Sequence, residues 1–482
     1  MSMIERIKHL EVIARQLEPI SEERNKLRNK VIQYSESFLD NLEDSKAFLQ
    51  TEDKGIKVYD SPISEEPADL DELLGILKEN VDKPGLNPAS GGHLAYIPGG
   101  GIFPASLGDY IAAITNHYAG VFYPSPGAVR IENLLIKWMC EIIGYPETAF
   151  GNLTSGGSIA NLIGIVTARD AHKLKAKDFH KVVIYTTEQV HHSVTKSIRI
   201  AGLGEAVIRD VQMDERFRMK TDILENAILK DKQNGLTPWL IIASAGTTDT
   251  GSIDPIDEIA EIAKKNNLWL HCDAAYGGFF VLCDEVNNSL KGLNKCDSIV
   301  IDPHKGLFLP YGSGTILVKD RTSLSKAHYY KANYLQEAVK VVDDLSPSDY
   351  SPELTKHFRG LRLWLPLKLF GLKPFRAALE EKIMLARYFY EKIQEIEGFE
   401  VGPYPELSVV IYRYIPPKGD PNEFNEKLIE EIINDGRVFL SSTMIDSKFY
   451  LRLAVLSFRS HLKIVNLALE VIKEKVKYLE AL

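Results

Sequence analysis

Two short apolar runs that stop abruptly at polar residues constrain this chain more than any other feature. The first run, Leu268-Trp269-Leu270, leads to Asp273, and the second, Ile299-Val300-Ile301, leads to Lys305. Apolar runs of this length are typical of strands buried on both faces of a parallel sheet. In an open α/β sheet the functional groups gather where such strands end. We therefore expect Asp273 and Lys305 to share one site.

An aspartate and a lysine at two strand ends suit the cofactor pyridoxal phosphate. A lysine amine can form a Schiff base with the cofactor aldehyde. An aspartate carboxylate can pair with the protonated pyridine nitrogen, which keeps the ring an electron sink. Each residue alone has an ordinary explanation, since aspartates often cap turns and lysines are usually solvated. Their setting within 271–276 and 302–305 favours the cofactor.

These two segments, His-Cys-Asp-Ala-Ala-Tyr and Asp-Pro-His-Lys, resemble the paired signatures of the group II pyridoxal-phosphate-dependent amino acid decarboxylases. That family includes the aromatic-L-amino-acid, tyrosine, histidine and glutamate decarboxylases. The resemblance extends over about residues 60–475. It implies an α/β fold of the aspartate aminotransferase type (fold-type I), with a mostly parallel central sheet and a smaller C-terminal α+β domain. It also implies a homodimer with the active site at the subunit interface.

The length of 482 residues predicts two or three domains, which we place by pattern. Residues 1–88 begin with apolar residues at helical spacing and charges between them, which predicts a helical arm. This arm packs on its own domain or, as the resemblance implies, on the partner subunit. Residues 89–372 are predicted to form the large cofactor-binding α/β domain, and residues 373–482 the small α+β domain.

The bulk composition favours a cytoplasmic enzyme. Apolar residues make up 45% of the chain and charged residues 26%, which is ordinary for a globular protein. A net charge of −9 argues against nucleic acid and anionic membrane partners. We find no apolar run of the ~20 residues that a membrane span needs, and no signal peptide. The four cysteines lack metal-ligand spacing, which predicts reduced thiols and no metal site.

A glycine-rich turn at residues 154–158 opens an apolar helix. Such a turn presents free backbone N–H groups and the positive end of the helix dipole, and both favour phosphate. A plain helix start is the ordinary explanation. However, the turn resembles the family's phosphate loop in order and position, so Gly156, Gly157 and Ser158 are the predicted phosphate contacts.

The resemblance assigns further side chains to the cofactor. His191 matches a histidine that stacks on the pyridine ring, although a lone histidine is more often an ordinary surface or core residue. Thr248, in a Gly-Thr-Thr run, is placed to hydrogen-bond cofactor or substrate. Ala275 and His304 lie within the two signatures and complete the predicted cofactor contacts.

Two loops rich in aromatic residues, 89–101 and 116–126, predict the walls of a substrate pocket. Aromatic packing between layers is the alternative. The residues that the resemblance places in the pocket are Tyr96, Pro98, Gly99, His117 and Tyr118. No Arg or Lys occurs in residues 89–125, which favours an aromatic substrate over glutamate. Gly306 and the glycines at 99–101 are expected to leave room for a bulky side chain.

A polar, proline-punctuated loop at residues 340–353 occupies the place of a mobile loop that closes over the site in the family. In the family a tyrosine on this loop protonates the α-carbon after CO₂ leaves. Tyr350 is the nearest tyrosine, with a surface aromatic as the alternative. The predicted function is decarboxylation of an L-amino acid, with the aromatic amino acids Tyr, Trp, Phe and dopa favoured, and the predicted catalytic residues are Lys305, Asp273, His191 and Tyr350.

Other functions stay open at this point. An aldehyde synthase would couple decarboxylation to oxidative deamination, as in relatives whose loop tyrosine is replaced by Phe. A decarboxylase of an acidic or aliphatic amino acid and a carbon–carbon lyase are further alternatives. A catalytically silent scaffold acting through protein partners is a fourth, and the intact Asp273, His304 and Lys305 argue against it.

Overall fold

A seven-stranded sheet forms the centre of the molecule in the computed structural model, which describes residues 1–329 and 344–482. Its strand order is β3-β9-β8-β7-β6-β4-β5. Strand β9 runs antiparallel to both of its neighbours, and all other pairs are parallel. Every residue of β3, β4, β7, β8 and β9 is buried, so both faces are covered, as a parallel sheet requires. The predicted mostly parallel α/β fold is confirmed.

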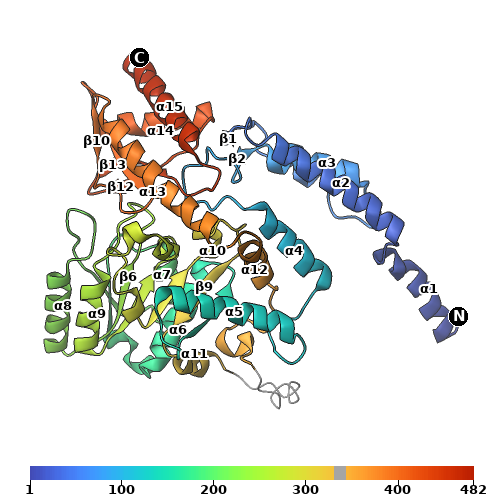
Figure 1. Ribbon diagram of the computed structural model, residues 1–482, viewed down its shortest axis with the longest axis horizontal. Coiled ribbons are helices and arrows are strands. Elements are labelled where there is room, and N and C mark those ends of the chain that lie inside the picture. Colours follow the sequence, from blue (N-terminus) through green and yellow to red (C-terminus); the bar gives the residue numbers. More distant parts are fainter. Residues whose placement is uncertain (330–343) are drawn as a thin grey trace.

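The strands of this sheet are β3 (Phe150–Thr154), β4 (Val182–Thr186), β5 (Val207–Asp210), β6 (Thr237–Ser244), β7 (Trp269–Asp273), β8 (Ser298–Ile301) and β9 (Gly314–Val318). The helices that follow or flank them are α4 (Phe103–Thr115), α5 (Pro126–Ile143), α6 (Gly157–Ala171), α7 (His192–Ile200), α8 (Thr221–Gln233), α9 (Ile256–Asn266), α10 (Pro303–Gly306), α11 (Arg321–His328) and α12 (Gly360–Phe370). Figure 1 shows them wrapped around the sheet.

The C-terminal part builds a second sheet with its own apolar core. Strands β10 (Phe399–Val401), β11 (Val409–Tyr414), β13 (Lys448–Ala454) and β12 (Ser441–Ile445) form an antiparallel sheet in that order. Helices α13 (Lys373–Gln394), α14 (Pro421–Asp435) and α15 (Leu462–Glu480) accompany it. Just before β12, which begins at Ser441, Phe439 makes an isolated bridge to His93. The domain boundaries at 88 and 372 stay predictions.

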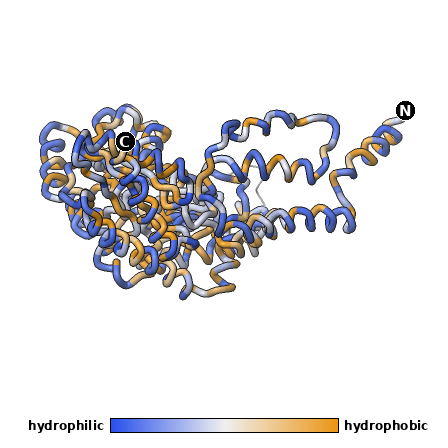
Figure 2. Tube along the Cα trace, turned by 90° about the horizontal axis from the view of Figure 1, so that it is seen from above, coloured by the Kyte–Doolittle hydropathy of each residue, from blue (hydrophilic) through white to orange (hydrophobic). Residues whose placement is uncertain are grey.

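The N-terminal helices project from this body (Figure 1). They are α1 (Met3–Ala14), α2 (Ser21–Asp40) and α3 (Leu70–Leu77). The strands β1 (Phe48–Leu49) and β2 (Gly85–Leu86), on either side of α3 in the sequence, form a short pair. No residue of α1, α2 or α3 is buried. Their apolar positions are therefore open to solvent in the single chain, and Figure 2 shows hydrophobic positions along the whole projection.

Helix α4 lies between the two aromatic loops and was not expected from the sequence. Its buried positions are the small residues Ala105, Gly108 and Ala112, which pack against α12. Its outer face is also apolar, since Phe103 and Ile114 are exposed. A helix that is apolar on the outside as well lacks the polar stripe by which amphipathic helices are identified.

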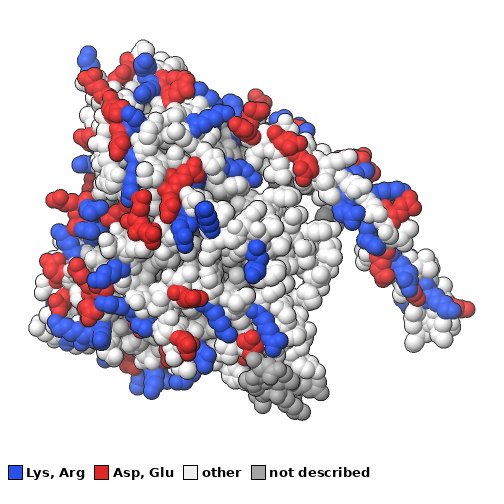
Figure 3. Space-filling view, in the orientation of Figure 1, with Lys and Arg blue, Asp and Glu red and all other residues white. Residues whose placement is uncertain are grey.

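The surface carries charges of both signs. On the face shown in Figure 3, Lys and Arg alternate with Asp and Glu over the body and along the projecting helices. Among the residues that the structure describes, no helix has the length and apolar content needed to cross a membrane.

Candidate active site

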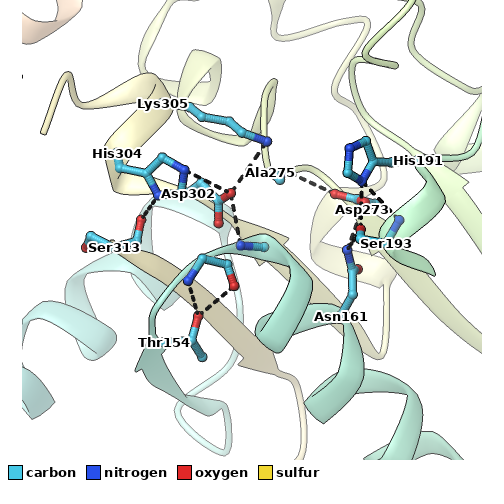
Figure 4. Close-up of polar contacts among 12 residues, drawn as sticks. Thr154, Asn161, His191, Ser193, Asp273, Ala275, Asp302, His304, Lys305 and Ser313 are labelled. Carbon is cyan, nitrogen blue, oxygen red and sulfur yellow. Dashed lines mark hydrogen bonds and ion pairs between the residues drawn. The ribbon is translucent and has the colours of Figure 1, made fainter. Parts of the chain in front are cut away.

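A cavity of about 490 Å³ opens at the C-terminal ends of β6, β7 and β8, beside the N-terminus of α6. Side chains from separate chain segments, among them His191, Asp273 and Lys305, come together there (Figure 4). The residues around it are Tyr96, Ile97, Ser155–Ile159, Asn161, Gln189, His191, Ser193, Ser244, Gly246–Thr248, Asp273, Ala275, Tyr276, Asp302, His304, Lys305, Tyr311 and Gly312. This is the strand-end site that the sequence predicts.

The short helix α10, which follows β8, delivers Lys305 to the cavity. The Lys305 Nζ atom lies 3.5 Å from Oδ2 of Asp302, and that oxygen also accepts the backbone N–H of Gly157 at 3.1 Å. Asp302 is 1% exposed, and its Oδ1 has no hydrogen-bond partner in the described part of the chain. Burial raises the pKa of Asp302, against the opposing effect of the nearby Lys305.

Asp273, the last residue of β7, has both carboxylate oxygens satisfied. Its Oδ1 accepts the backbone N–H of Ala275 at 3.1 Å, and its Oδ2 accepts the Asn161 side-chain amide at 2.9 Å. Asp273 is buried, while its cavity side remains open to a ligand. A carboxylate held by two N–H donors is a rigid acceptor for a further positive or N–H group.

His191 caps the N-terminus of α7 and lines the cavity. Its Nδ1 accepts the backbone N–H of Ser193 at 3.3 Å and lies 2.7 Å from the Ser193 hydroxyl. Burial lowers the pKa of His191, so the imidazole is neutral at pH 7. Such a ring presents a flat face and its second nitrogen to the cavity.

The N-terminus of α6, where the sequence predicts a phosphate cradle, lies at the cavity. The helix begins at Gly157, directly after Gly156, whose φ of 155° is strained for residues with a side chain. A Cβ on Gly157 would lie 2.9 Å from Asp302 Oδ2, so only glycine allows this approach. The helix thus brings the positive end of its dipole to the cavity that Lys305 and Asp273 share, with the Gly157 N–H donated to Asp302, and this positive end fits the phosphate of pyridoxal phosphate.

The structure brings most of the predicted residues together. At the cavity lie Gly156, Gly157, Ser158, His191, Thr248, Asp273, Ala275, His304, Lys305 and Tyr96. Arg452 holds the turn that contains Thr248, because its Nε donates to the backbone oxygen of the next residue, Asp249, at 2.8 Å. Arg452 therefore supports the site from the C-terminal sheet.

Five predicted residues do not line this cavity in the single chain: Pro98, Gly99, His117, Tyr118 and Tyr350. His117 is exposed and meets Phe358 edge to face, with the ring centroids 6.3 Å apart. Tyr350 is buried against Phe150, with 5.2 Å between the ring centroids. The role of Tyr350 as the acid stays a prediction, and residues 340–343 of its loop lie outside the described residues.

The expectation that glycines widen the pocket is wrong. A Cβ on Gly306 would lie 2.7 Å from Cβ of Phe279, and a Cβ on Gly99 would lie 2.2 Å from the backbone oxygen of His304. Both glycines permit close packing behind the lysine and add no space for a substrate.

The sequence analysis missed several residues of the cavity, above all Asn161, Gln189, Ser193 and Asp302. Asn161 lies one turn into α6, and Ser193 lies two residues after His191. Asp302 ends the same apolar run that leads to Lys305, so its position was a usable signal. In the described part of the chain, no three His, Cys, Asp or Glu side chains are grouped as metal ligands.

Comparison with known proteins agrees with this geometry. The sequence profile of the pyridoxal-dependent decarboxylase conserved domain matches residues 54–415. An aromatic-L-amino-acid decarboxylase of Bacillus atrophaeus is 32% identical over 403 residues, which are 83% of this chain and 84% of the relative. A phenylacetaldehyde synthase of Petunia hybrida is 30% identical over 420 residues, 82% of either chain.

A solved structure, the Oryza sativa TDC with PLP and tryptamine, superposes with a TM-score of 0.89 at 24% identity. The superposition covers 96% of this chain and 99% of that one. The predicted fold-type I architecture, with its smaller C-terminal part, is confirmed.

Proposed function

The chain belongs to the group II pyridoxal-dependent decarboxylases, which are carboxy-lyases that use pyridoxal phosphate, and on this premise we propose that it converts an aromatic L-amino acid to its amine and CO₂. The observation that carries the proposal is the convergence of Lys305, Asp273 and the N-terminus of α6 on one cavity. These three groups match the aldehyde, the pyridine nitrogen and the phosphate of the cofactor. Pyridoxal phosphate, when bound, supplies an aldehyde carbon for the lysine amine and a ring that takes up the electron pair released when CO₂ leaves.

The residues of this chain have separate tasks in that reaction. The Asp273 carboxylate holds a proton on the ring nitrogen, because its two fixed N–H donors keep it in place. The neutral His191 ring lies over the cavity, where it can stack and orient the substrate carboxylate. The Lys305 amine would hold the cofactor through its aldehyde and, as a free amine, could take up and return a proton. The N–H groups at the start of α6 hold the phosphate.

The aromatic substrate is supported by the relatives and by Tyr96. A tryptophan decarboxylase of Oryza sativa and a tyrosine decarboxylase of Arabidopsis thaliana are 29% and 31% identical to this chain. Tyr96 lines the cavity with 60% of its surface exposed, so its ring is free to pack on a ligand. An aldehyde synthase is the second candidate, because a phenylacetaldehyde synthase is equally similar.

The purified protein loaded with pyridoxal phosphate would be incubated with pooled L-amino acids. Amines are followed by mass spectrometry and peroxide by a coupled assay. We expect an amine from Tyr, Trp, Phe or dopa without peroxide. Aldehyde with peroxide would favour the synthase, and an acidic or aliphatic amine would overturn the aromatic substrate.

We also propose that the protein is a homodimer and that the projecting helices α1 and α2 pack on the second copy. The exposed apolar residues of α1, among them Ile7, Leu10 and Ile13, support this arrangement. The aromatic residues His117 and Tyr118 are also available to a second copy, which would explain why they stay away from their own cavity. The cytoplasmic location predicted from the sequence likewise remains a proposal.

Light scattering on the wild type should give the mass of two chains. The double variant Ile7→Glu/Leu10→Glu should weaken the dimer, since it places charges in an apolar contact. Lys8→Glu changes charge on the same helix and serves as the matched control. A monomeric wild type would refute the dimer without affecting the proposed chemistry.

A further inference from the structure

A buried chain of hydrogen bonds runs under the cavity from β7 and β8 to α6. The Trp269 indole Nε1 donates to Ser298 Oγ at 2.8 Å, and Ser298 Oγ lies 2.8 Å from His271 Nδ1. The opposite ring nitrogen of His271, Nε2, lies 2.8 Å from Asn161 Oδ1. The Asn161 amide nitrogen then donates to Asp273. The chain thus ends on the proposed partner of the cofactor ring.

The direction of every bond follows from its last member. A carboxylate can only accept, so the amide N–H₂ of Asn161 faces Asp273 and the Asn161 oxygen faces His271 Nε2. The proton of a neutral His271 must therefore be on Nε2, which donates it to that oxygen. Nδ1 is then an acceptor, and Ser298, whose oxygen accepts the Trp269 indole N–H, donates its own hydrogen to Nδ1.

A branch of the same chain reaches His191. The Asn161 amide nitrogen also lies 3.3 Å from Ser193 Oγ, so this hydroxyl accepts from Asn161 and donates to His191 Nδ1. The backbone N–H of Ser193 points to the same ring nitrogen. Nδ1 of His191 therefore accepts two hydrogen bonds, and the neutral ring carries its proton on Nε2. Figure 4 shows this branch from Asn161 through Ser193 to His191.

The chain is isolated from solvent. Ser298 and His271 have no exposed surface, and Asn161 is 1% exposed. Burial lowers the pKa of His271 to about 4, so the imidazole stays neutral and keeps one tautomer. Inside a protein, a fully satisfied polar network of this kind enforces a single arrangement.

We propose that Trp269, Ser298, His271 and Asn161 are positioning residues that hold the Asp273 carboxylate in place and keep His191 in the Nε2–H tautomer. One buried chain of hydrogen bonds thereby links the acceptor offered to the cofactor ring nitrogen with the donor offered to the substrate side. The roles of Asp273 and His191 in this inference rest on the proposed function. The tautomers themselves do not, because they follow from the hydrogen bonds of the chain alone.

The first test uses the cofactor-free chain labelled with ¹⁵N-histidine. Long-range ¹H–¹⁵N spectra distinguish the two neutral tautomers, and the variants His271→Gln and His191→Gln assign the two signals. We expect both rings to carry the proton on Nε2. An Nδ1–H tautomer at either residue would overturn the inference, while the proposed enzyme activity would be unaffected.

The second test compares His271→Gln with His271→Leu, two substitutions of similar size. Glutamine retains an acceptor for Ser298 and a donor for Asn161, whereas leucine retains neither. We expect the Kd for pyridoxal phosphate to stay within about threefold of the wild type in His271→Gln. In His271→Leu it should rise about tenfold to a hundredfold, the worth of one hydrogen bond to a charged group.

The visible absorbance of the bound cofactor should change in His271→Leu only, and kcat should fall more than KM changes. A packing role predicts the opposite order, because leucine suits a buried apolar site. If His271→Leu binds pyridoxal phosphate as tightly as His271→Gln, or more tightly, the proposal is therefore refuted. If neither variant folds, Asn161→Leu decides: loss of the acceptor for Nε2–H should leave His271 as a mixture of tautomers, and an unchanged Nε2–H signal counts against the chain. A wild type that fails to bind the cofactor would refute the proposed function instead.

Discussion

Two buried aspartates flank the same cavity, and their surroundings differ sharply. Each oxygen of Asp273 accepts one N–H, at 3.1 and 2.9 Å. One of the two donors, the Asn161 side chain, is itself held by a hydrogen bond with His271. Asp302 receives one N–H on a single oxygen, and its ion pairs with Lys305 and His304 are long, at 3.5 and 3.8 Å. Its other oxygen has no partner among the described residues.

The difference separates one end of the site, where both carboxylate oxygens have hydrogen-bond donors, from another end, where only one oxygen has a donor. The Asp273 end is organised before any ligand arrives, which lowers the cost of ordering when the ring nitrogen binds. At the Asp302 end the carboxylate holds one N–H of the α6 N-terminus but makes only long ion pairs with Lys305 and His304, and such a cluster can rearrange around a charged ligand. Changes at the first end should therefore affect the chemistry, and changes at the second should affect cofactor retention.

Asp273→Asn should have the largest effect. A neutral amide cannot hold the ring proton, so we expect kcat to fall by at least about a hundredfold, comparable to the loss of one preorganised electrostatic group. Folding should be retained, since Asn accepts the Ala275 N–H as well. Turnover is measured by amine release, with circular dichroism as the folding control. Near-normal turnover by Asp273→Asn would contradict the proposed pairing of Asp273 with the ring nitrogen.

Gly157→Ala should weaken cofactor binding by about tenfold, roughly the value of one charge-assisted hydrogen bond. The added methyl would press on Asp302 Oδ2 and move the start of α6. Equilibrium dialysis of pyridoxal phosphate gives the affinity. Gly127→Ala, at the start of α5 with open space around it, is the matched control and should bind normally. Equal affinities in the two variants would show that the cradle tolerates a side chain.

Asp302→Asn should stabilise the cofactor-free protein at neutral pH by about 1 kcal/mol, because an ionised buried carboxylate with an unpaired oxygen is costly. Burial raises the folded-state pKa of this acid above its unfolded value of about 3.9. Its favourable contribution is therefore complete below the unfolded pKa and is lost as pH rises through the folded pKa.

The gap in unfolding midpoint between variant and wild type should accordingly widen as pH rises from about 4 to 7. Thermal unfolding at several pH values measures it. A gap that is constant with pH would mean that Asp302 does not titrate differently in the folded state. Ser313→Ala, a buried polar neighbour without charge, controls for lost packing.

Tyr350→Phe should have the smallest effect if Tyr350 keeps its place against Phe150 during turnover. We then expect kcat within about threefold of the wild type and amine as the product, because the deleted hydroxyl has no hydrogen-bond partner among the described residues. Aldehyde and peroxide from this variant would instead support the sequence prediction that Tyr350 is the acid. The assay for amine and peroxide distinguishes the two results directly.

The sequence alone identified residues that the structure brings to one cavity, because each of them lies next to an element that local pattern identifies. Asp273 and Lys305 follow apolar runs, and Gly156–Ser158 open a helix. The order of these segments along the chain also indicated the α/β fold, since strands alternating with helices form parallel sheets. Helix α4 escaped detection because both of its faces are apolar or small.

Tertiary structure decided which distant residues meet. Asn161 and Asp273 are joined only because α6 packs across β7, and no local pattern encodes that contact. The same packing puts Tyr350 against Phe150 and fills the space beside Gly306 with Phe279. Short-range spacing determines strand ends and helix starts, whereas hydrogen-bond direction and pocket shape depend on contacts between segments more than a hundred residues apart, such as Asn161 and His271.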